Sequence, residues 1–321
     1  MVTGLPGQAP DVLVIGEVLV ELTALEPLRD GTQLRLGFSG DALNAAAAAA
    51  AAGAHTCLLA RVPDDELGDQ LVARVAALGV DTSLLVRTAG QHGLYLQHAD
   101  PEGQREFVYV RRGSAGSSLT DSDVPEAAAR AGVVLASGVA CAISASARSA
   151  VHVAARAARC FIYDPNWRPR LVDAATAGSH LRTLAPYARL VTPAWPREAG
   201  ALLGATPAGP AEACAALRAL GAGAVALTQG SRGVLLDDGG DLTAVPAYPV
   251  DHVADQTGAG DVLTGPVAAR LALGDDLCAA VRLGAAAAAL SLRGHGGTGY
   301  LAGLDESRRL VARTSGLEVS T

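Results

Sequence analysis

Asp255-Gln256-Thr257-Gly258-Ala259-Gly260-Asp261 is followed directly by an apolar, alanine-rich helical pattern over residues 262–273. Small residues just before a helix allow backbone N–H groups to crowd around an anion, and the partial positive charge of the helix N-terminus strengthens such a site. The stretch therefore predicts an anion hole made by the amides of Gly258, Ala259 and Gly260. The carboxylate of Asp261 is expected at its mouth.

A carboxylate beside an anion hole has the chemistry that phosphoryl transfer to an alcohol requires. The carboxylate takes the hydroxyl proton, while N–H groups and a metal ion neutralise the transferring phosphate. On this interpretation Asp261 is a general base. The simpler alternative is an aspartate that caps a helix after a glycine turn.

Length and composition limit the classes of protein that fit. A chain of 321 residues with 50% hydrophobic residues can bury one large core, and its alternating strand and helix patterns favour one α/β domain. The net charge of −7 argues against a nucleic-acid or anionic-membrane partner. All 25 basic residues are arginines, so a cationic contact to phosphate must come from arginine, a backbone amide or a metal.

The cysteines and the apolar tracts predict the cellular setting. The five cysteines are scattered without a Cys-x-x-Cys pair, which favours reduced residues of a cytoplasmic protein over a disulfide frame or a zinc site. The N-terminal residues have neither a basic start nor an apolar run, so no signal peptide is expected. The longest apolar tract, residues 45–52, is too short to span a bilayer.

The first part of the chain predicts a buried strand over residues 11–16 and an exposed sheet over residues 21–38. Ser39-Gly40-Asp41-Ala42-Leu43-Asn44 then opens into eight alanines, and Gly53 is well placed to end that helix. Asp41 and Asn44 are either helix caps or ligands at the mouth of the helix.

Residues 93–98 and 105–110 alternate like half-exposed strands. Tyr95 and Tyr109 both fall in these strands, although aromatic residues make up only 3% of the chain. Arg111 follows directly, and its guanidinium can form a bidentate pair with a carboxylate.

The second half consists of repeated strand–helix units, with strands expected at residues 133–137, 160–163, 190–191, 223–227 and 234–237. Asn166 and Arg168 follow one of these strands, at the edge where open parallel sheets bind ligands. In Thr228-Gln229-Gly230-Ser231-Arg232-Gly233 the glycines let the backbone approach a phosphate, although a simple β-turn fits the same spacing. A last helix is expected over residues 283–292, and a frayed tail after Thr314.

Asp-x-Thr-Gly-Ala-Gly-Asp resembles the C-terminal signature of the PfkB (ribokinase-like) sugar kinases, and the other motifs follow that family's order over residues 11–313. The resemblance implies a single domain with the ribokinase-like α/β fold. This is a three-layer α/β/α sandwich with a mostly parallel central sheet and a small β-sheet lid. The lid would come from segments near residues 17–38 and 92–112. Ser39, Gln256 and His295 depart from the family pattern.

The resemblance also assigns roles at the site. It implies ATP and Mg²⁺ as cofactors, Asp261 as the base, and a monovalent cation such as K⁺ near Asp255. The residues implied to bind the sugar are Gly40, Asp41, Asn44, Tyr95, Tyr109, Arg111 and Asp261. Those implied to bind ATP are Asn166, Arg168, Thr228, Gly230, Gly233, Gly258 and Gly260.

Tyr109-x-Arg111 followed by Gly-Ser-Ala-Gly resembles the 2-keto-3-deoxygluconate kinase branch of that family, in which the lid tyrosine and arginine reach a keto-acid substrate. The expected reaction is therefore phosphorylation of a primary hydroxyl of 2-keto-3-deoxygluconate to its 6-phosphate. Two alternatives stay open, a kinase of a neutral sugar of the fructose or ribose type and a sugar-binding relative that has lost catalysis. The resemblance also implies a homo-oligomer formed through the lid.

Overall fold

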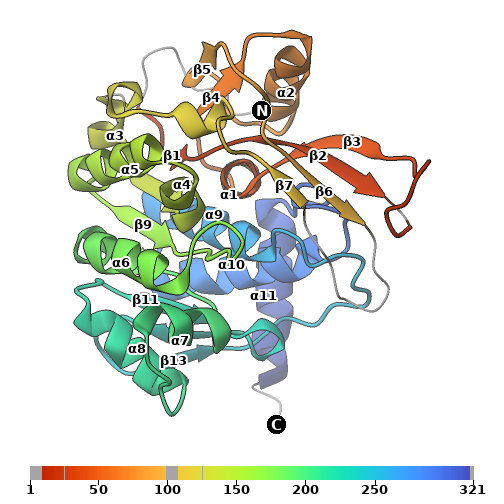
Figure 1. Cartoon of the computed structure of the whole chain (residues 1–321). Helices are drawn as coiled ribbons and strands as arrows, with labels where there is room; N and C mark the ends of the chain where they lie inside the picture. The colour runs from red at the N-terminus through yellow and green to blue at the C-terminus, as the bar shows by residue number, and fades with distance from the viewer. Residues whose placement is uncertain (1–8, 25, 99–107, 125, 319–321) are drawn as a thin grey trace.

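A nine-stranded sheet runs through the middle of the molecule in this computed structural model, which describes residues 9–24, 26–98, 108–124 and 126–318 (Figure 1). Its strand order is β13-β12-β11-β10-β9-β8-β1-β4-β5. The strands are β1 (Val12–Ile15), β4 (Thr56–Pro63), β5 (Leu85–Thr88), β8 (Val133–Ser137), β9 (Phe161–Asp164), β10 (Ala188–Val191), β11 (Val225–Thr228), β12 (Val234–Asp237) and β13 (Thr243–Val245).

The strands from β11 to β5 pair in parallel, whereas β12 and β13 add an antiparallel edge next to β11. The central strand β1 has both faces buried. Val12 and Val14 belong to one core cluster, and Leu13 and Ile15 belong to the other. A continuous apolar run is what a parallel strand covered on both faces requires.

Helices cover each face of the sheet (Figure 1). One face carries α1 (Asp41–Ala51), α2 (Glu66–Ala77), α9 (Ala259–Ala272), α10 (Leu277–Ser291) and α11 (Leu304–Glu318). The other carries α3 (Ala127–Arg130), α4 (Gly138–Ile143), α5 (Ala145–Ala157), α6 (Ala174–Leu184), α7 (Arg197–Leu203) and α8 (Pro210–Ala219). Short 3₁₀ turns occur at Gly116–Ser118, Asp121–Asp123, Ala185–Tyr187 and Gly230–Arg232. None of the helices within the described ranges has the length and apolar character needed to cross a membrane.

Helices α1 and α9 pack with their backbones in close approach. A Cβ atom added at Gly265 of α9 would lie 2.2 Å from the carbonyl oxygen of Ala45 in α1, so only glycine fits at this crossing. Both helices begin at the same end of the sheet, because Gly40 and Gly258, their N-terminal caps, line one pocket.

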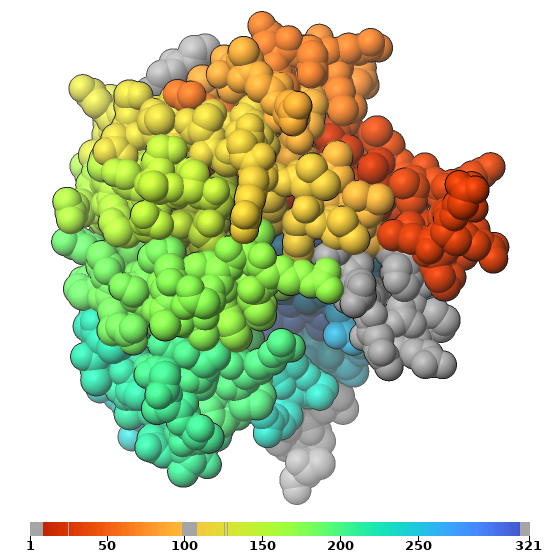
Figure 2. Space-filling view, in the orientation of Figure 1, coloured from red at the N-terminus to blue at the C-terminus, as the bar shows by residue number. Residues whose placement is uncertain are grey.

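A separate four-stranded sheet, which we call the lid, has the order β3-β2-β6-β7. Its strands are β2 (Leu19–Ala24), β3 (Arg35–Ser39), β6 (Leu94–His98) and β7 (Val108–Val110). Figure 2 shows the red β2–β3 hairpin standing out from the body of the molecule. The pairing register places polar side chains on the pocket face of the lid, including Glu21, Tyr95 and Tyr109.

The opposite face of the lid is apolar. The same register brings together the side chains of Val20, Leu22, Leu36, Phe38, Leu94, Leu96, Val108 and Val110. The inner part of this face, at Phe38, packs against the main core, but Leu36, Val108 and Val110 are about half exposed.

The predicted three-layer α/β/α architecture with its small lid sheet is confirmed, but several predicted bounds differ from the structure, by one or two residues at strands β9, β10 and β11 and by more at three other places. Helix α9 begins at Ala259, three residues before the predicted start, because Gly258 adopts a φ of 78° and caps it. Helix α10 begins at Leu277, not 283, because the side chain of Asp276 caps it by accepting the amide of Ala279. The chain also does not end as a frayed tail after Thr314, since α11 runs to Glu318 and packs on the core through Leu304, Leu310 and Val311. Residues 105–107 of the predicted lid strand lie outside the described residues.

Candidate active site

A pocket of about 500 Å³ lies between the lid and the carboxyl ends of the central strands. Of the residues predicted for the site, all line this pocket except Gly233 and Asp255. The fold therefore brings four segments that are far apart in sequence to one place. These four parts of the fold are the start of α1, the lid, the group of three loops that follow β9, β10 and β11, and the start of α9.

Asp261 occupies the first turn of α9 and is only 6% exposed. Its Oδ2 atom accepts a hydrogen bond of 2.9 Å from the side-chain amide of Asn44, and its Oδ1 atom accepts one of 3.2 Å from Asn166. Two amide groups thus hold the carboxylate in one orientation. Asn44 is itself fixed, because its Oδ1 atom accepts the hydroxyl of Ser39 at 3.1 Å.

Burial, together with the nearby charge of Asp41, raises the pKa of Asp261 to about 7, although Asn44, Arg168 and Asn166 act in the opposite direction. An ordinary aspartate would have a pKa near 3.9 and would be a weak base. A carboxylate whose pKa lies close to neutral pH is suited to general-base catalysis.

Glycines at the start of α9 open the backbone to the pocket. A Cβ at Gly260 would meet no heavy atom within 4 Å, whereas one at Gly258 would lie 2.8 Å from the Cα of Gly297. The first N–H groups of a helix have no partner within the helix and are therefore available to an anion. The amide of Ala259 also points back to the carbonyl of Gln256, at 3.3 Å.

Arg168 lies among the acidic groups of the pocket, with part of its side chain open to solvent at the pocket mouth. Desolvation lowers the pKa of its guanidinium, but the charges of Asp261, Tyr109 and Asp41 outweigh that effect and keep the pKa above its usual value. The sequence assigned Arg168 and Asn166 to ATP. The structure brings Asn166 into direct contact with Asp261 and places Arg168 next to both Asp261 and Asp41 on the lid side of the pocket.

Arg111 also lines the pocket, but it forms an ion pair with Glu17, a buried residue just after β1. Burial, with the nearby charge of Arg168, lowers the pKa of Arg111 to about 9. Gly116 packs on the same carboxylate side chain, since a Cβ there would lie 2.8 Å from the Cβ of Glu17. Arg111 therefore already has a counter-ion, which the sequence did not reveal.

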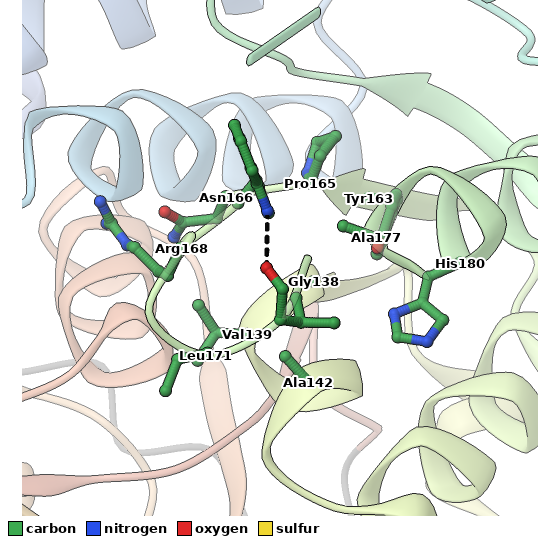
Figure 3. Close-up of a pocket in the computed structure, with 12 residues that line it drawn as sticks. Gly138, Val139, Ala142, Tyr163, Pro165, Asn166, Arg168, Leu171, Ala177 and His180 are labelled. Carbon is green, nitrogen blue, oxygen red and sulfur yellow. Dashed lines mark hydrogen bonds between the residues drawn. The ribbon is translucent and has the colours of Figure 1, made fainter. Parts of the chain in front are cut away.

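Hydrogen bonds of Trp167 and Glu198 fix the conformation of the loop after β9. Trp167 donates its indole N–H to the carbonyl of Val172 at 2.9 Å, the hydrogen bond drawn in Figure 3. Glu198 accepts the backbone amides of Trp167 at 2.5 Å and Ala194 at 2.6 Å, which ties this loop to the one after β10. In Figure 3, Asn166 and Arg168 lie on this loop at the left of the view, and His180 of α6 lies at the right. All three line a cavity of only about 10 Å³. That cavity has at most the volume of one water molecule.

Gly233 and Asp255 lie outside the pocket. Gly233 has a φ of 86°, and a Cβ there would lie 2.1 Å from the carbonyl oxygen of Val245, so its glycine serves the packing of β12 on β13. Asp255 accepts the amides of Thr257 at 2.8 Å and Gly296 at 3.0 Å and thereby shapes the turn that precedes α9.

Sequence reasoning missed three polar residues that hold the site in place, Glu17, Ser137 and Glu198. Ser137 donates its hydroxyl to Asp41. Glu17 and Ser137 each stand at the carboxyl end of a predicted strand, so their position was the signal that could have identified them. Glu198 follows the strand predicted at residues 190–191 and loosely matches a glutamate of the family, but the sequence does not show its role, because its partners are backbone amides.

The acidic groups of the pocket suit a magnesium ion that is held mainly by phosphate. Asp41 and Asp261 line the pocket, whereas Asp164 is buried behind Asp261, and burial together with the charges of Glu198 and Asp261 raises the pKa of Asp164 well above its usual value. No set of three candidate ligand side chains converges on one point in the described part of this pocket. Magnesium in phosphoryl-transfer sites typically binds substrate phosphates, waters and one or two carboxylates.

The activity should depend on pH through Asp261. Only about a tenth of a base with a pKa of about 7 is ionised at pH 6, so kcat/KM should rise about tenfold per pH unit below 7 and level off above pH 8. The variant Asn44→Ala loses a hydrogen-bond donor that stabilises the ionised form of Asp261. Its pH profile should therefore have its inflection at a higher pH. Initial rates from pH 5.5 to 9 measure both profiles, and a kcat/KM that does not change with pH over this range would contradict this role.

The sequence of this chain is similar to those of known carbohydrate kinases. The family described as pfkB family carbohydrate kinase matches residues 9–301. The 2-dehydro-3-deoxygluconokinase of Thermoproteus tenax is 33% identical over 293 residues, which cover 89% of this chain and 89% of that protein.

Solved structures share the fold. The crystal structure of a PfkB protein from Polaromonas sp. JS666 has a TM-score of 0.81 and 28% identity, covering 94% of this chain and 99% of the other. A putative ribokinase II from E. coli in complex with ATP and Mg²⁺ has a TM-score of 0.83 and 24% identity over the same shares of the two chains.

Proposed function

Because the chain belongs to the pfkB family of carbohydrate kinases, and is thus a phosphotransferase acting on sugars, we propose that it phosphorylates 2-keto-3-deoxygluconate. In this reaction the γ-phosphoryl group of ATP passes to a primary hydroxyl and gives the 6-phosphate. The same sugar acid is also called 2-dehydro-3-deoxygluconate, and the Thermoproteus tenax relative takes its name from it.

The observation that carries the proposal is the setting of Asp261. The carboxylate is buried, held by Asn44 and Asn166, and stands next to the open backbone at Gly260. Asp261 would take the proton of the sugar hydroxyl, and the amides at the start of α9 would bind the negative charge that develops on the transferring phosphate. A sugar-binding relative without catalysis would have no need for a base with a pKa of about 7.

Two arginines in the pocket favour a sugar acid over a neutral sugar. Arg168 faces the pocket from the loop after β9, and Arg111 faces it from the end of the lid. A carboxylate on the substrate would pair with a guanidinium, whereas a neutral sugar would cover these charges without adding a partner. Since Glu17 already neutralises Arg111, we assign the larger share of carboxylate binding to Arg168.

The nucleotide would lie across the start of α9 and the loop that contains Thr228 and Gly230. Asp164 and Asp261 would lie near a Mg²⁺ ion bound with ATP, and this ion would supply positive charge to the transferring group. For K⁺, Asp255 offers a carboxylate close to the turn before α9. We propose a cytoplasmic location, and neither nucleic acid nor membrane is proposed as a partner of this acidic chain.

A panel of acceptors tests the proposed reaction. ADP release with Mg-ATP should be fastest with 2-keto-3-deoxygluconate and much slower with gluconate, fructose and ribose. Turnover with fructose or ribose alone would keep the kinase and overturn the acid assignment. Binding of a sugar without any turnover would instead support the non-catalytic alternative.

We also propose that two copies of the chain associate through the lids. The apolar face of the lid continues across all four strands, and Leu36 and Val110 are 51% and 54% exposed on it. A patch of this kind is stabilised when a second copy covers it.

The variant Leu36→Asp should therefore shift the protein toward the monomer, because an aspartate buried in such an interface would be desolvated without a partner. Sedimentation equilibrium measures the mass. Leu242→Asp is the matched control, since Leu242 is 44% exposed and follows β12, away from the lid. A wild-type protein that is monomeric at all accessible concentrations would contradict the proposal.

A further inference from the structure

Three side chains of types that can bind a metal ion lie close together at the amino end of the central sheet. His55 precedes β4, Cys57 lies within it, and Asp81 follows α2 and forms a β-bridge with Cys57. The Nε2 atom of His55 is 3.0 Å from Oδ2 of Asp81 and 4.0 Å from Sγ of Cys57, and all three ligand atoms lie within 4.8 Å of one another. This is the one such group of three in the described residues.

Backbone hydrogen bonds hold the three residues in place. The amide of His55 donates to the carboxylate of Asp11 at 2.8 Å, and the amide of Asp11 donates back to the carbonyl of His55 at 2.9 Å. The amide of Asp81 donates to Thr56 at 2.8 Å, and the remaining carboxylate oxygen of Asp81 accepts the amide of Ser83 at 2.8 Å. The ligand atoms are therefore positioned by the sheet itself, which lowers the entropic cost of binding.

Two of the three side chains in the cluster are buried, and the third is partly exposed to solvent. His55 is 6% exposed and Cys57 is 4% exposed, whereas about a third of the Asp81 side chain reaches solvent. The Nδ1 atom of His55 is buried and makes no hydrogen bond within the described part of the chain, so the imidazole has its polar contacts on the Nε2 side only. An ion can enter past Asp81, and a water molecule can occupy a further coordination position there.

We propose that His55, Cys57 and Asp81 bind one Zn²⁺ ion through Nε2, Sγ and Oδ2. Zinc accepts nitrogen, sulfur and oxygen ligands together, while a thiolate disfavours Mg²⁺ and Ca²⁺. Zinc bonds of about 2.0–2.3 Å place the atoms of a tetrahedral site about 3.3–3.6 Å apart. The observed separations of 3.0 and 4.0 Å lie on either side of that range, so small side-chain movements would complete the site.

Binding exchanges one proton for the metal. Burial, together with the charge of Asp81, raises the pKa of Cys57 to about 12, so the metal-free residue is a thiol. The zinc–sulfur bond forms as the thiol proton leaves to solvent, and no oxidant or reductant is needed. The positive ion removes the unfavourable contact between a thiolate and Asp81.

The proposed zinc site is separate from the pocket, which lies at the carboxyl ends of the same strands, and it does not depend on the kinase function. It would join the segment before β4 to the segment after α2 and so stabilise the edge formed by β1, β4 and β5 (Figure 1). The sequence predicted no zinc site, because the ligands at 55, 57 and 81 form no Cys-x-x-Cys spacing and meet only through sheet pairing.

The test uses full-length protein stripped of metal with a chelator and titrated with Zn²⁺ and with Co²⁺. We expect one ion per chain, a higher melting temperature, and a thiolate-to-cobalt charge-transfer band with Co²⁺. Loss of a ligand should weaken binding by more than about 100-fold, since even outer partners of metal sites are worth 10- to 100-fold. The ligand variants are Cys57→Ser and Asp81→Asn. The control is Cys160→Ser, which changes a half-buried cysteine elsewhere on the sheet.

The wild-type protein also gives a readout that needs no variant. Each Zn²⁺ ion that binds should release about one proton, which titration in a weakly buffered solution measures. Folded wild-type protein without saturable binding would overturn the proposal. Binding that is unchanged in both Cys57→Ser and Asp81→Asn would overturn it as well, because the ion would then be adventitious.

Discussion

The variant Asp261→Asn is expected to lower kcat by about 10²–10⁴-fold while leaving the affinity for ATP within a few fold of the wild type. Asparagine has nearly the same shape but cannot accept a proton from the sugar. It also offers one acceptor oxygen where the carboxylate offers two, so Asn44 and Asn166 can no longer both donate to it. The amides at the start of α9 remain, and with them the binding of phosphate.

Steady-state kinetics with the preferred sugar, together with nucleotide titration by calorimetry, separate these two effects. Asp275→Asn is the matched control, because Asp275 pairs with Arg270 just beyond the other end of α9. An Asp261→Asn enzyme with near-normal turnover would remove Asp261 as the base. A loss of ATP binding of the same size as the loss in kcat would point instead to damage of the helix start.

The variant Arg168→Gln should show two changes that have separate causes. The first is a loss of about 30-fold or more in kcat/KM for the sugar acid, since truncating one partner of a charge pair that the bound substrate shields from water costs about 2 kcal/mol or more. The second is a pH profile displaced to higher pH. Arg168 lowers the pKa of Asp261, and without that positive charge the base ionises later.

Rates from pH 5.5 to 9 with 2-keto-3-deoxygluconate and with fructose distinguish the two changes. Arg111→Gln provides a comparison within the pocket and should have the smaller effect on the acid, because Arg111 is already paired with Glu17. Arg170→Gln changes an exposed arginine in the same loop and should leave both readouts near those of the wild type. Equal losses for the acid and the neutral sugar in Arg168→Gln would assign this residue to phosphate.

The order of strands and helices could be predicted from the sequence because each buried strand has a continuous apolar run with a glycine or polar residue at its end. Residues 133–137 and 234–237, for example, are strands with the predicted bounds. Helix α11 was missed because its apolar residues are few and widely spaced among charges. Only the core against which Leu304 and Leu310 pack makes that segment helical to Glu318.

The site residues were identified by motif, but their mutual contacts were not. Asn166 was placed at ATP on the basis of its loop, whereas its contact with Asp261 joins residues 95 positions apart. The pairing of Arg111 with Glu17 likewise depends on the lid folding back onto the end of β1. Such contacts are fixed by topology, and no local pattern encodes them.

The alanine run of α1 has a consequence for the geometry of the reaction. The beginnings of α1 and α9 carry Asn44 and Asp261, which form a hydrogen bond to each other, and Gly265 brings the two helix backbones into contact. In the proposed reaction, the size of the side chains between these helices would therefore set the distance between the acceptor hydroxyl and the phosphorus atom. A bulkier residue in the contact between α1 and α9 would increase the distance over which the phosphoryl group is transferred, although it would touch neither substrate. The small residues between α1 and α9 would thus keep the acceptor hydroxyl close to the phosphorus atom.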